Sequence, residues 1–257
     1  MADVKAGMPI TPDSLFDLAS VSKHMTGVAT LTLVEQGALK LDQPVAHCLE
    51  DFAVPVKGRA VTVTDVLHHV SGLADYTSDD WDGSDEEFAS LTPGTHLKWL
   101  NGTKPRRVPG VKYEYNNSEY VLLALIVERL SGQSFAQYVH DHLFAPAGME
   151  HTVILDGTAK LPSRTVKGYA TNANGKVKRS SVPTVITGDG NVYGDGYGFG
   201  WVVDKDHTVS HSGSWNGTAS YLLLDLQKGF TVAVLSNDEN TAVGSLAEEI
   251  LALFTGD

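Results

Sequence analysis

Two side chains near the N-terminus have the types and the spacing that nucleophilic chemistry requires. Ser20 and Lys23 form an S-x-x-K motif at the start of a predicted buried helix, which puts them on one face, one turn apart. A serine hydroxyl is a poor nucleophile until a neighbouring group takes its proton, and a lysine can do this when burial and nearby cations lower its pKa. Because about one such match is expected by chance in a chain of ordinary composition, the motif alone decides nothing.

A second motif with acid–base potential lies near the middle of the chain. Tyr115-Asn116-Asn117 is a Y-x-N sequence just ahead of a predicted helix. A tyrosine near a lysine is drawn toward the phenolate, so it can pass protons between a nucleophile and a leaving group. The side chain of Asn117 offers amide donors to a substrate carbonyl. In isolation, a core tyrosine beside a turn asparagine is the simpler interpretation.

A third motif, His211-Ser212-Gly213, lies on or beside a predicted strand and is followed by Ser214 and Trp215. An edge strand here would bring the N–H of Ser214 beside that of Ser20, and two such donors make an oxyanion hole. Gly213 would permit this close approach, and Trp215 is a candidate wall of the cleft. Each motif occurs once and in this order, so the set indicates a serine hydrolase that works through an acyl-enzyme.

The elements that must position these motifs change in kind along the chain. Apolar residues at helical spacing predict helices from about Ser20 to Gly37 and over residues 64–69, 118–131, 134–144 and 242–254. Runs rich in β-branched and aromatic residues predict antiparallel strands at 200–203, 220–224 and 230–235, with a hairpin turn at Gln227-Lys228-Gly229. Helices first and strands later favour an α+β fold.

The motif set resembles the serine β-lactamase-like family, in particular its class C β-lactamase, D,D-peptidase and family VIII esterase branch. Similar segments extend beyond the motifs: residues 15–20, 37–45, 66–73 and 197–201. The resemblance implies a β-lactamase/transpeptidase-like α+β fold, with an antiparallel sheet flanked by helices and a helical subdomain. It implies one domain over residues 1–257, with a sheet-side region of about 1–45 and 195–257 and a helical region of about 46–194.

Carried over position by position, the resemblance also implies roles for the motif residues. Ser20 is then the nucleophile, and Lys23 and Tyr115 are the general-base pair. The remaining residues would bind the substrate or line the cleft: Asn117, His211, Gly213, Ser214 and Trp215. The N–H groups of Ser20 and Ser214 would form the oxyanion hole, and the family chemistry implies neither a metal nor an organic cofactor.

Departures from the family pattern carry expectations of their own. Many members have lysine where this chain has His211, and a histidine with a pKa near 6.5 is mostly neutral at pH 7, which favours small esters or amides over anionic substrates. The segments before Ser20 and between Tyr115 and His211 are short for the family. We therefore expect a trimmed fold, with three strands instead of five, and an exposed sheet edge through which a homo-oligomer could form.

Composition narrows the possible partners. The formal net charge is −12, and no basic cluster reverses it locally, so nucleic acid is not expected as a partner. The pairs His68/His69 and His140/His142 do not converge in helical geometry, and no metal site is predicted. The chain has no apolar run of membrane-spanning length and no secretion signal, so the sequence as written predicts a cytoplasmic protein, although members of the resembled family are often periplasmic or secreted.

Three functions stay open at this point. The first is an esterase or amidase for small acyl substrates. The second is a β-lactamase or penicillin-binding D,D-peptidase with the same nucleophile. The third is a non-catalytic binding module that retains the fold. A Ser-His-Asp mechanism is disfavoured because the chain has no G-x-S-x-G elbow.

Overall fold

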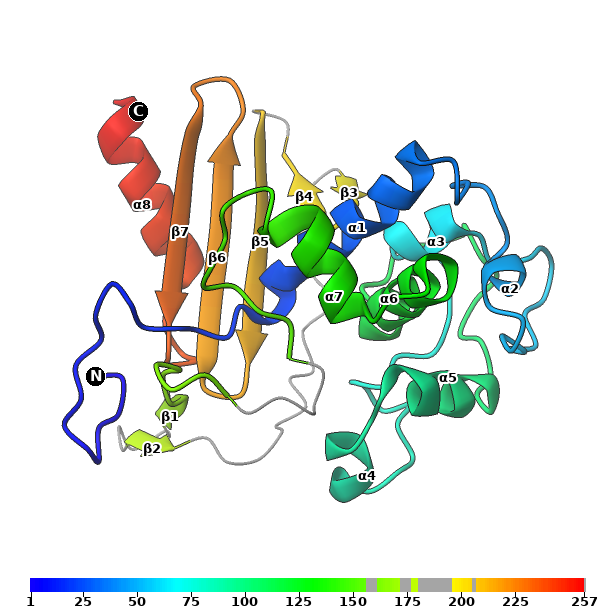
Figure 1. Ribbon diagram of the computed structural model, residues 1–257, viewed down its shortest axis with the longest axis horizontal. Coiled ribbons are helices and arrows are strands. Elements are labelled where there is room, and N and C mark those ends of the chain that lie inside the picture. The colour runs from blue at the N-terminus through cyan, green and yellow to red at the C-terminus, as the bar shows by residue number, and fades with distance from the viewer. Residues whose placement is uncertain (156–160, 172–176, 180–195, 205–206, 257) are drawn as a thin grey trace.

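The computed structural model describes residues 1–155, 161–171, 177–179, 196–204 and 207–256. An antiparallel sheet in the order β3-β4-β5-β6-β7 stands beside a group of helices, and the C-terminal helix α8 lies on the other side of the sheet (Figure 1). A separate two-stranded sheet joins β1 and β2. The strands are β1 Tyr169–Thr171, β2 Val177–Arg179, β3 Gly196–Gly198, β4 Trp201–Val203, β5 Thr208–Trp215, β6 Thr218–Asp225 and β7 Phe230–Ser236.

The helices follow the apolar periodicity of the sequence in most cases. They are η1 Ala19–Ser22, α1 Lys23–Glu35, α2 Val45–Cys48, α3 Val63–Leu67, α4 Asp85–Ala89, α5 Pro93–Asn101, α6 Asn117–Ser131, α7 Phe135–Val139, η2 His140–Phe144 and α8 Val243–Thr255. The α6 helix ends at Gly132, whose φ of 72° is the left-handed conformation of a glycine cap. None of the described helices is long and apolar enough to cross a membrane.

The main core lies between the helices. Fully buried side chains of α6, among them Leu122 and Ile126, pack with Ala29 and Leu33 of α1 and with residues of α2, α3 and α5. A smaller apolar cluster, which includes Leu223, joins β6 and β7 to α8 on the far face of the sheet. The helices thus hold α1 from one side, while η1, which leads into α1, packs against β5 and β6.

The expectation of three strands is wrong, because the described residues contain a five-stranded sheet. The predicted strands correspond to β4, β6 and β7. The additional strands are β5 and β3, and β3 pairs with β4 through a two-residue turn at Phe199 and Gly200. Both turn residues have positive φ, 54° and 88°, as a type I′ turn requires. The β3 strand has only three residues, two of them glycines, so it produces no strand pattern in the sequence.

The start of α3 also differs from the expectation. The predicted helix began at residue 64, whereas α3 begins at Val63 with Thr62 as its cap: Thr62 Oγ1 accepts a hydrogen bond from the N–H of Asp65, and the Asp65 carboxylate accepts from the N–H of Thr62. Asp65 also pairs with Arg59. This reciprocal capping box orients α3 and the His69-Val70-Ser71 segment that follows it.

Candidate active site

Ser20 lies in a tight turn between the N-terminal segment and α1. The preceding residue, Ala19, has φ of 46°, which is uncommon for a residue with a side chain. Two hydrogen bonds fix this conformation: the Ala19 N–H donates to Asp17 Oδ1 at 2.8 Å, and Ser22 Oγ donates to the Ala19 carbonyl at 2.6 Å. Local strain of this kind is sustained only where the surroundings determine the backbone.

Lys23 reaches Ser20 as the S-x-x-K spacing predicts. Its Nζ lies 3.1 Å from Ser20 Oγ, and only 8% of the residue is exposed. Burial lowers the pKa of Lys23 to about 7, while the charge of Asp75 acts in the opposite direction. A substantial fraction of this amine is therefore neutral near pH 7, the state in which it can accept a proton from the hydroxyl.

Asn117 holds Lys23 from the other side. Lys23 Nζ donates to Asn117 Oδ1 at 2.7 Å, and Asn117 Nδ2 donates to Thr77 Oγ1 at 2.8 Å. Both ends of the amide are thus engaged within the protein. Besides its predicted role in substrate binding, Asn117 therefore makes a contact that positions Lys23.

The Tyr115 ring joins the same group. Its centre lies 4.9 Å from Lys23 Nζ, and its ring packs 4.6 Å from that of His69 and 6.3 Å from that of His211. The structure therefore brings together Ser20, Lys23, Tyr115 and Asn117, which come from two stretches of the chain about ninety residues apart, 20–23 and 115–117.

The third motif lies along the part of β5 that faces the nucleophile. The β4 strand pairs with β5 only at Val209 and Ser210, and beyond this point β5 packs on η1. A Cβ on Gly213 would lie 2.3 Å from the Leu18 carbonyl oxygen and 3.1 Å from the N atom of Ser20. The glycine thus permits the close approach that an oxyanion hole between Ser20 and exposed Ser214 would need.

His211, which the sequence predicts to lie at the substrate site, is fully buried. Its Nδ1 donates to the Ser212 carbonyl at 2.6 Å, so in the neutral ring Nε2 accepts from Tyr197 Oη at 2.9 Å. Burial, followed by the charge of Lys23, lowers the pKa of His211 to about 3. The ring is therefore neutral at pH 7, and the third motif carries no fixed positive charge.

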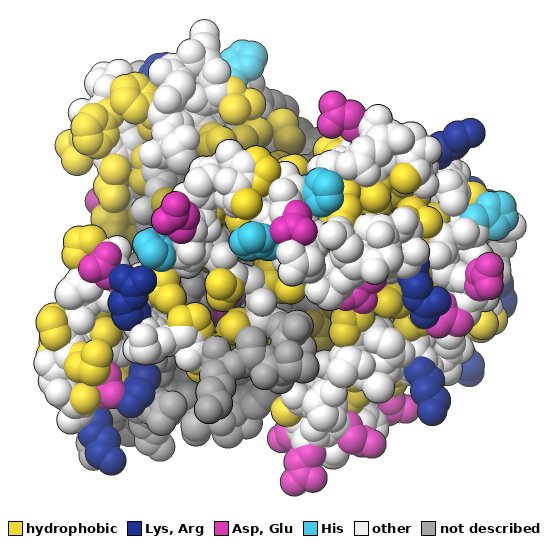
Figure 2. Space-filling view, in the orientation of Figure 1, with side chains coloured by type: hydrophobic (Ala, Val, Ile, Leu, Met, Phe, Trp, Pro, Cys, Tyr) yellow, Lys and Arg dark blue, Asp and Glu magenta, His cyan; other side chains and the backbone are white. Residues whose placement is uncertain are grey.

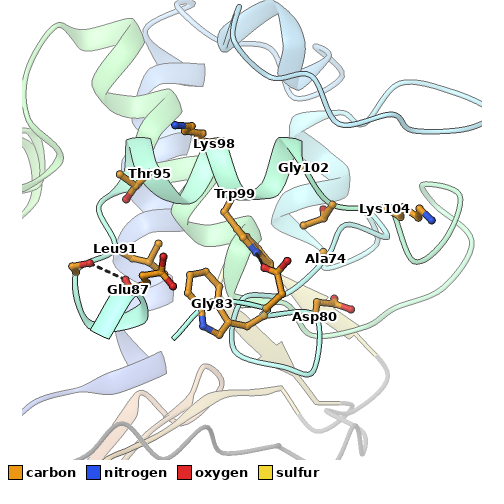
Figure 3. A pocket seen from close by; sticks show the side chains of 14 residues that line it. Ala74, Asp80, Gly83, Glu87, Leu91, Thr95, Lys98, Trp99, Gly102 and Lys104 are labelled. Carbon is orange, nitrogen blue, oxygen red and sulfur yellow. Dashed lines mark hydrogen bonds between the residues drawn. The ribbon is translucent and has the colours of Figure 1, made fainter. Parts of the chain in front are cut away.

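Trp215, at the end of β5, begins a row of aromatic rings. Its ring stacks on Phe88 at 6.4 Å, Phe88 contacts Trp81 at 5.7 Å, and Trp81 contacts Trp99 at 5.4 Å. A cavity of about 780 Å³ between α4 and α5 is lined by Trp81 and Trp99 of this row, but not by Phe88 or Trp215 nor by any residue of the three motifs. In Figure 3, Trp99 projects into this cavity, whereas Lys98 and Lys104 point away from it.

Sequence reasoning missed a buried polar cluster behind Tyr115. Glu119 is 1% exposed and its Oε2 lies 2.5 Å from His69 Nδ1, while Ser71 donates to Glu119 through both its Oγ and its N–H. Burial raises the pKa of Glu119 well above its usual value and lowers that of His69. A signal was present in the pair His68/His69, which the sequence analysis considered only as possible metal ligands. Among the described residues, no group of three or more His, Cys, Asp or Glu side chains converges as metal ligands do.

Comparison with known proteins identifies the class to which this fold, with its close pair of Ser20 and Lys23, belongs. The family model described as Beta-lactamase matches residues 1–195 and 190–256. The chain therefore belongs to the beta-lactamase family, which confirms the resemblance and the β-lactamase/transpeptidase-like α+β fold.

Individual relatives are more distant. The chain is 28% identical over 313 aligned residues to penicillin-binding protein 4* of Bacillus subtilis, covering 97% of this chain and 68% of the relative. It is 26% identical to protein flp of Staphylococcus aureus, covering 96% of this chain and 58% of the relative. The chain thus spans little more than half to two thirds of the length of these relatives.

Solved structures share the fold over nearly the whole chain. A penicillin-binding protein from Bacillus halodurans matches with a TM-score of 0.81 and 22% identity, covering 98% of this chain and 90% of that one. The octameric penicillin-binding protein homologue from Pyrococcus abyssi matches with 0.84 and 23%, covering 100% and 69%. The D-amino acid amidase from Ochrobactrum anthropi matches with 0.74 and 22%, covering 92% and 80%.

Proposed function

We propose that this protein is a serine hydrolase that forms an acyl-enzyme on Ser20 and acts on small esters or amides. The observation that carries the proposal is the contact of 3.1 Å between Lys23 Nζ and Ser20 Oγ, made by an amine whose pKa is lowered to about 7. Membership of the beta-lactamase family supports the same chemistry.

The proposed reaction follows from this geometry. Ser20 Oγ attacks the substrate carbonyl carbon as its proton passes to Lys23 Nζ, and the N–H groups of Ser20 and Ser214 stabilise the oxyanion. The tetrahedral intermediate collapses, the bond to the leaving group breaks, and the proton is delivered to the leaving group by Lys23 with Tyr115. Water then attacks the ester carbonyl, Ser20 Oγ recovers a proton, and the carboxylic acid product leaves.

Substrate preference is inferred from the third motif and from the cavity. Because His211 is buried and neutral, the site lacks the fixed cation that would select an anionic carboxylate at this position. The aromatic row runs from Trp215, beside the third motif, to Trp81 and Trp99. The cavity that Trp81 and Trp99 line also carries the carboxylates of Asp80, Asp82 and Glu87, which disfavour an anionic group there. Uncharged esters and amides with an apolar or aromatic group fit these properties.

Acylation of β-lactams is the second candidate, favoured by the similarity to penicillin-binding protein 4*. Intact-mass spectrometry after incubation with p-nitrophenyl butyrate, nitrocefin, penicillin or a fluorophosphonate tests both. Rapid turnover of the ester without a stable penicillin adduct supports the esterase or amidase, and a stable adduct identifies a penicillin-binding protein.

The Ser20→Ala variant should abolish every adduct, and Ser163→Ala, a change at an exposed serine, serves as the matched control. If the folded protein is unreactive toward all four probes, the hydrolase proposal is wrong and a binding module remains.

We further propose that the protein forms a homo-oligomer through the edge of β7. Among the described strands, β7 pairs only with β6. Its seven residues include no charged side chain and no proline, the devices that usually protect an edge. Phe230 and Leu235 on β7 are exposed, as are Leu253 and Phe254 on α8, and Figure 2 shows apolar side chains gathered over the α8 side of the molecule.

Light scattering over a wide range of protein concentration tests this proposal. Association should weaken in Leu235→Lys, which places a charge beside the edge of β7. It should persist in Val111→Lys, the control, which replaces an exposed aliphatic side chain outside the sheet with the same charged one. A monomer at every concentration would contradict it.

A further inference from the structure

A continuous chain of hydrogen bonds leads from the amine of Lys23 to a buried carboxylate on another segment. Lys23 Nζ donates to Asn117 Oδ1 at 2.7 Å, Asn117 Nδ2 donates to Thr77 Oγ1 at 2.8 Å, and Thr77 Oγ1 donates to Asp75 Oδ1 at 3.0 Å. Each hydrogen bond is donated in the same direction, from the Lys23 ammonium group toward the Asp75 carboxylate. This directionality also determines which end of the Asn117 amide faces the lysine.

The carboxylate at the end of this hydrogen-bond chain is held in place by further contacts. Asp75 is 5% exposed and Thr77 is 6% exposed. Asp75 Oδ1 also accepts from the Thr77 N–H at 3.0 Å, and the Asp75 N–H donates to Asp80 Oδ2 at 3.0 Å. Asp80 in turn pairs with Arg106 at 2.6 Å. A buried carboxylate is costly unless it is hydrogen-bonded or paired, so these contacts indicate that the fold keeps it in place.

We propose that Asp75 is a positioning residue for Lys23, which it holds in place and influences electrostatically through Thr77 and Asn117. The chemical consequence rests on the proposed function, in which Lys23 is the base for Ser20. Asp75 makes no hydrogen bond to Lys23 or Ser20: it orients the amine through the other two side chains, and its charge acts on the amine through space.

The electrostatic effect has a definite sign. Burial lowers the pKa of Lys23, and the negative charge of Asp75 partly offsets this by favouring the protonated amine. Without Asp75, the pKa of Lys23 should fall further. Other titratable groups face Lys23 from the elements around it: Tyr115, Tyr120, His69 and His211, with His24 next to it in the chain. Glu119 and Tyr197 lie behind them, against His69. None of them is altered in the test below.

Asp75→Asn removes the charge while leaving an oxygen that can still accept from Thr77. The acid limb of the Ser20 acylation rate against pH should move to lower pH by about half a unit, less than the 1–3 units of a direct ion pair. Asp79→Asn is the matched control, because Asp79 is an exposed carboxylate four residues away. Its acid limb should coincide with that of the wild type.

Thr77→Val makes the complementary change: it breaks the hydrogen-bond chain but keeps the carboxylate. Acylation should fall about tenfold because the lysine is less well oriented, with a smaller movement of the acid limb than in Asp75→Asn. Thr77→Ser keeps the hydroxyl and should restore the rate. A role confined to fold stability would lower the rate equally at all pH values and would leave the acid limb unmoved.

Direct titration separates this inference from the proposed function. The ε-carbon resonance of Lys23 in protein labelled with ¹³C-lysine, assigned with Lys23→Arg, reports the charge of the amine whether or not Ser20 reacts. A lower midpoint in Asp75→Asn than in Asp79→Asn supports the inference, and equal midpoints overturn it. If Asp75→Asn does not fold, Thr77→Val and Thr77→Ser are compared instead. Equal Lys23 midpoints and equal acylation rates in these two variants would overturn the inference.

Discussion

Gly213 offers the sharpest test of the contact between β5 and the nucleophile turn. Gly213→Ala adds a single methyl group where the strand meets the Leu18 to Ser20 segment. The new Cβ would lie 2.3 Å from the Leu18 carbonyl oxygen, 2.3 Å from Ser220 Oγ and 3.1 Å from the N atom of Ser20. Ser220 Oγ already donates to the same carbonyl at 2.6 Å, so neither neighbour can turn away freely.

The geometry sets the size of the expected effect. Ordinary contacts of a Cβ begin near 3.4 Å, so the strand and the turn must separate by about 1 Å. Overpacking of this kind lowers the free energy of unfolding by about 1–3 kcal/mol. A misplacement of about 1 Å at a reacting group can cost about 10²-fold in rate, and loss of one oxyanion donor costs about 10²–10³-fold. Acylation of Ser20 should therefore fall by at least about 10²-fold in protein that is still folded.

The measurement combines urea denaturation with the rate of fluorophosphonate labelling under native conditions. Gly196→Ala is the control, because an added Cβ there meets nothing within 4 Å and the backbone has no positive φ; it should change neither quantity appreciably. If Gly213→Ala labelled at the wild-type rate while fully folded, the argument that Gly213 permits the approach of Ser214 to Ser20 would be refuted.

Three further predictions follow from buried and capping groups. The pKa of Lys23 is about 7 in the folded protein and 10.5 for the free side chain, so between these pH values the unfolded chain binds one more proton than the folded protein. The free energy of unfolding should therefore rise with pH in this range by up to about 1.4 kcal/mol per pH unit. Urea denaturation at pH 6, 7.5 and 9 should show this slope in the wild type and a smaller one in Lys23→Met. Glu119→Ala leaves His69 and Ser71 without their partner and should cost about 3–5 kcal/mol by the same assay, whereas Glu150→Ala at an exposed position should cost little. Thr62→Ala removes the cap of α3 and should cost about 1 kcal/mol of unfolding free energy in thermal or urea denaturation, and an unchanged stability would contradict the capping assignment.

The long helices could be predicted because their apolar residues repeat at helical spacing over several turns. The α6 helix and its Gly132 cap are the clearest example. The short helices α4 and α5 were missed because they have only one or two turns, although each begins with a capping box, Ser84 with Glu87 and Thr92 with Thr95. The β3–β4 hairpin escaped prediction because its turn uses Phe199 at positive φ, a residue that does not normally indicate a type I′ turn.

The sequence indicated which residues make up the candidate site, but not the contacts between those that are distant in the chain. Ser20 and Lys23 lie one turn apart on one stretch of chain, so local geometry is enough to bring them together. The burial of His211 could not be predicted, because it depends on Tyr197 and on the packing of β5 against the helices. The same holds for Asp75, which reaches the lysine only through two side chains on different segments.

The sequence by itself determined the local features of this protein: the order of helices and strands, the three motifs, and the pairing of hydroxyl and amine across one helical turn. The tertiary structure alone decided the protonation behaviour of the lysine, the neutral state of His211 and the course of the hydrogen bonds that end at Asp75. The physical reason is that spacing acts along the chain, whereas desolvation and charge act through space. The contact of Lys23 with Asn117 joins residues 94 positions apart, and no local pattern specifies which distant groups will surround a buried amine.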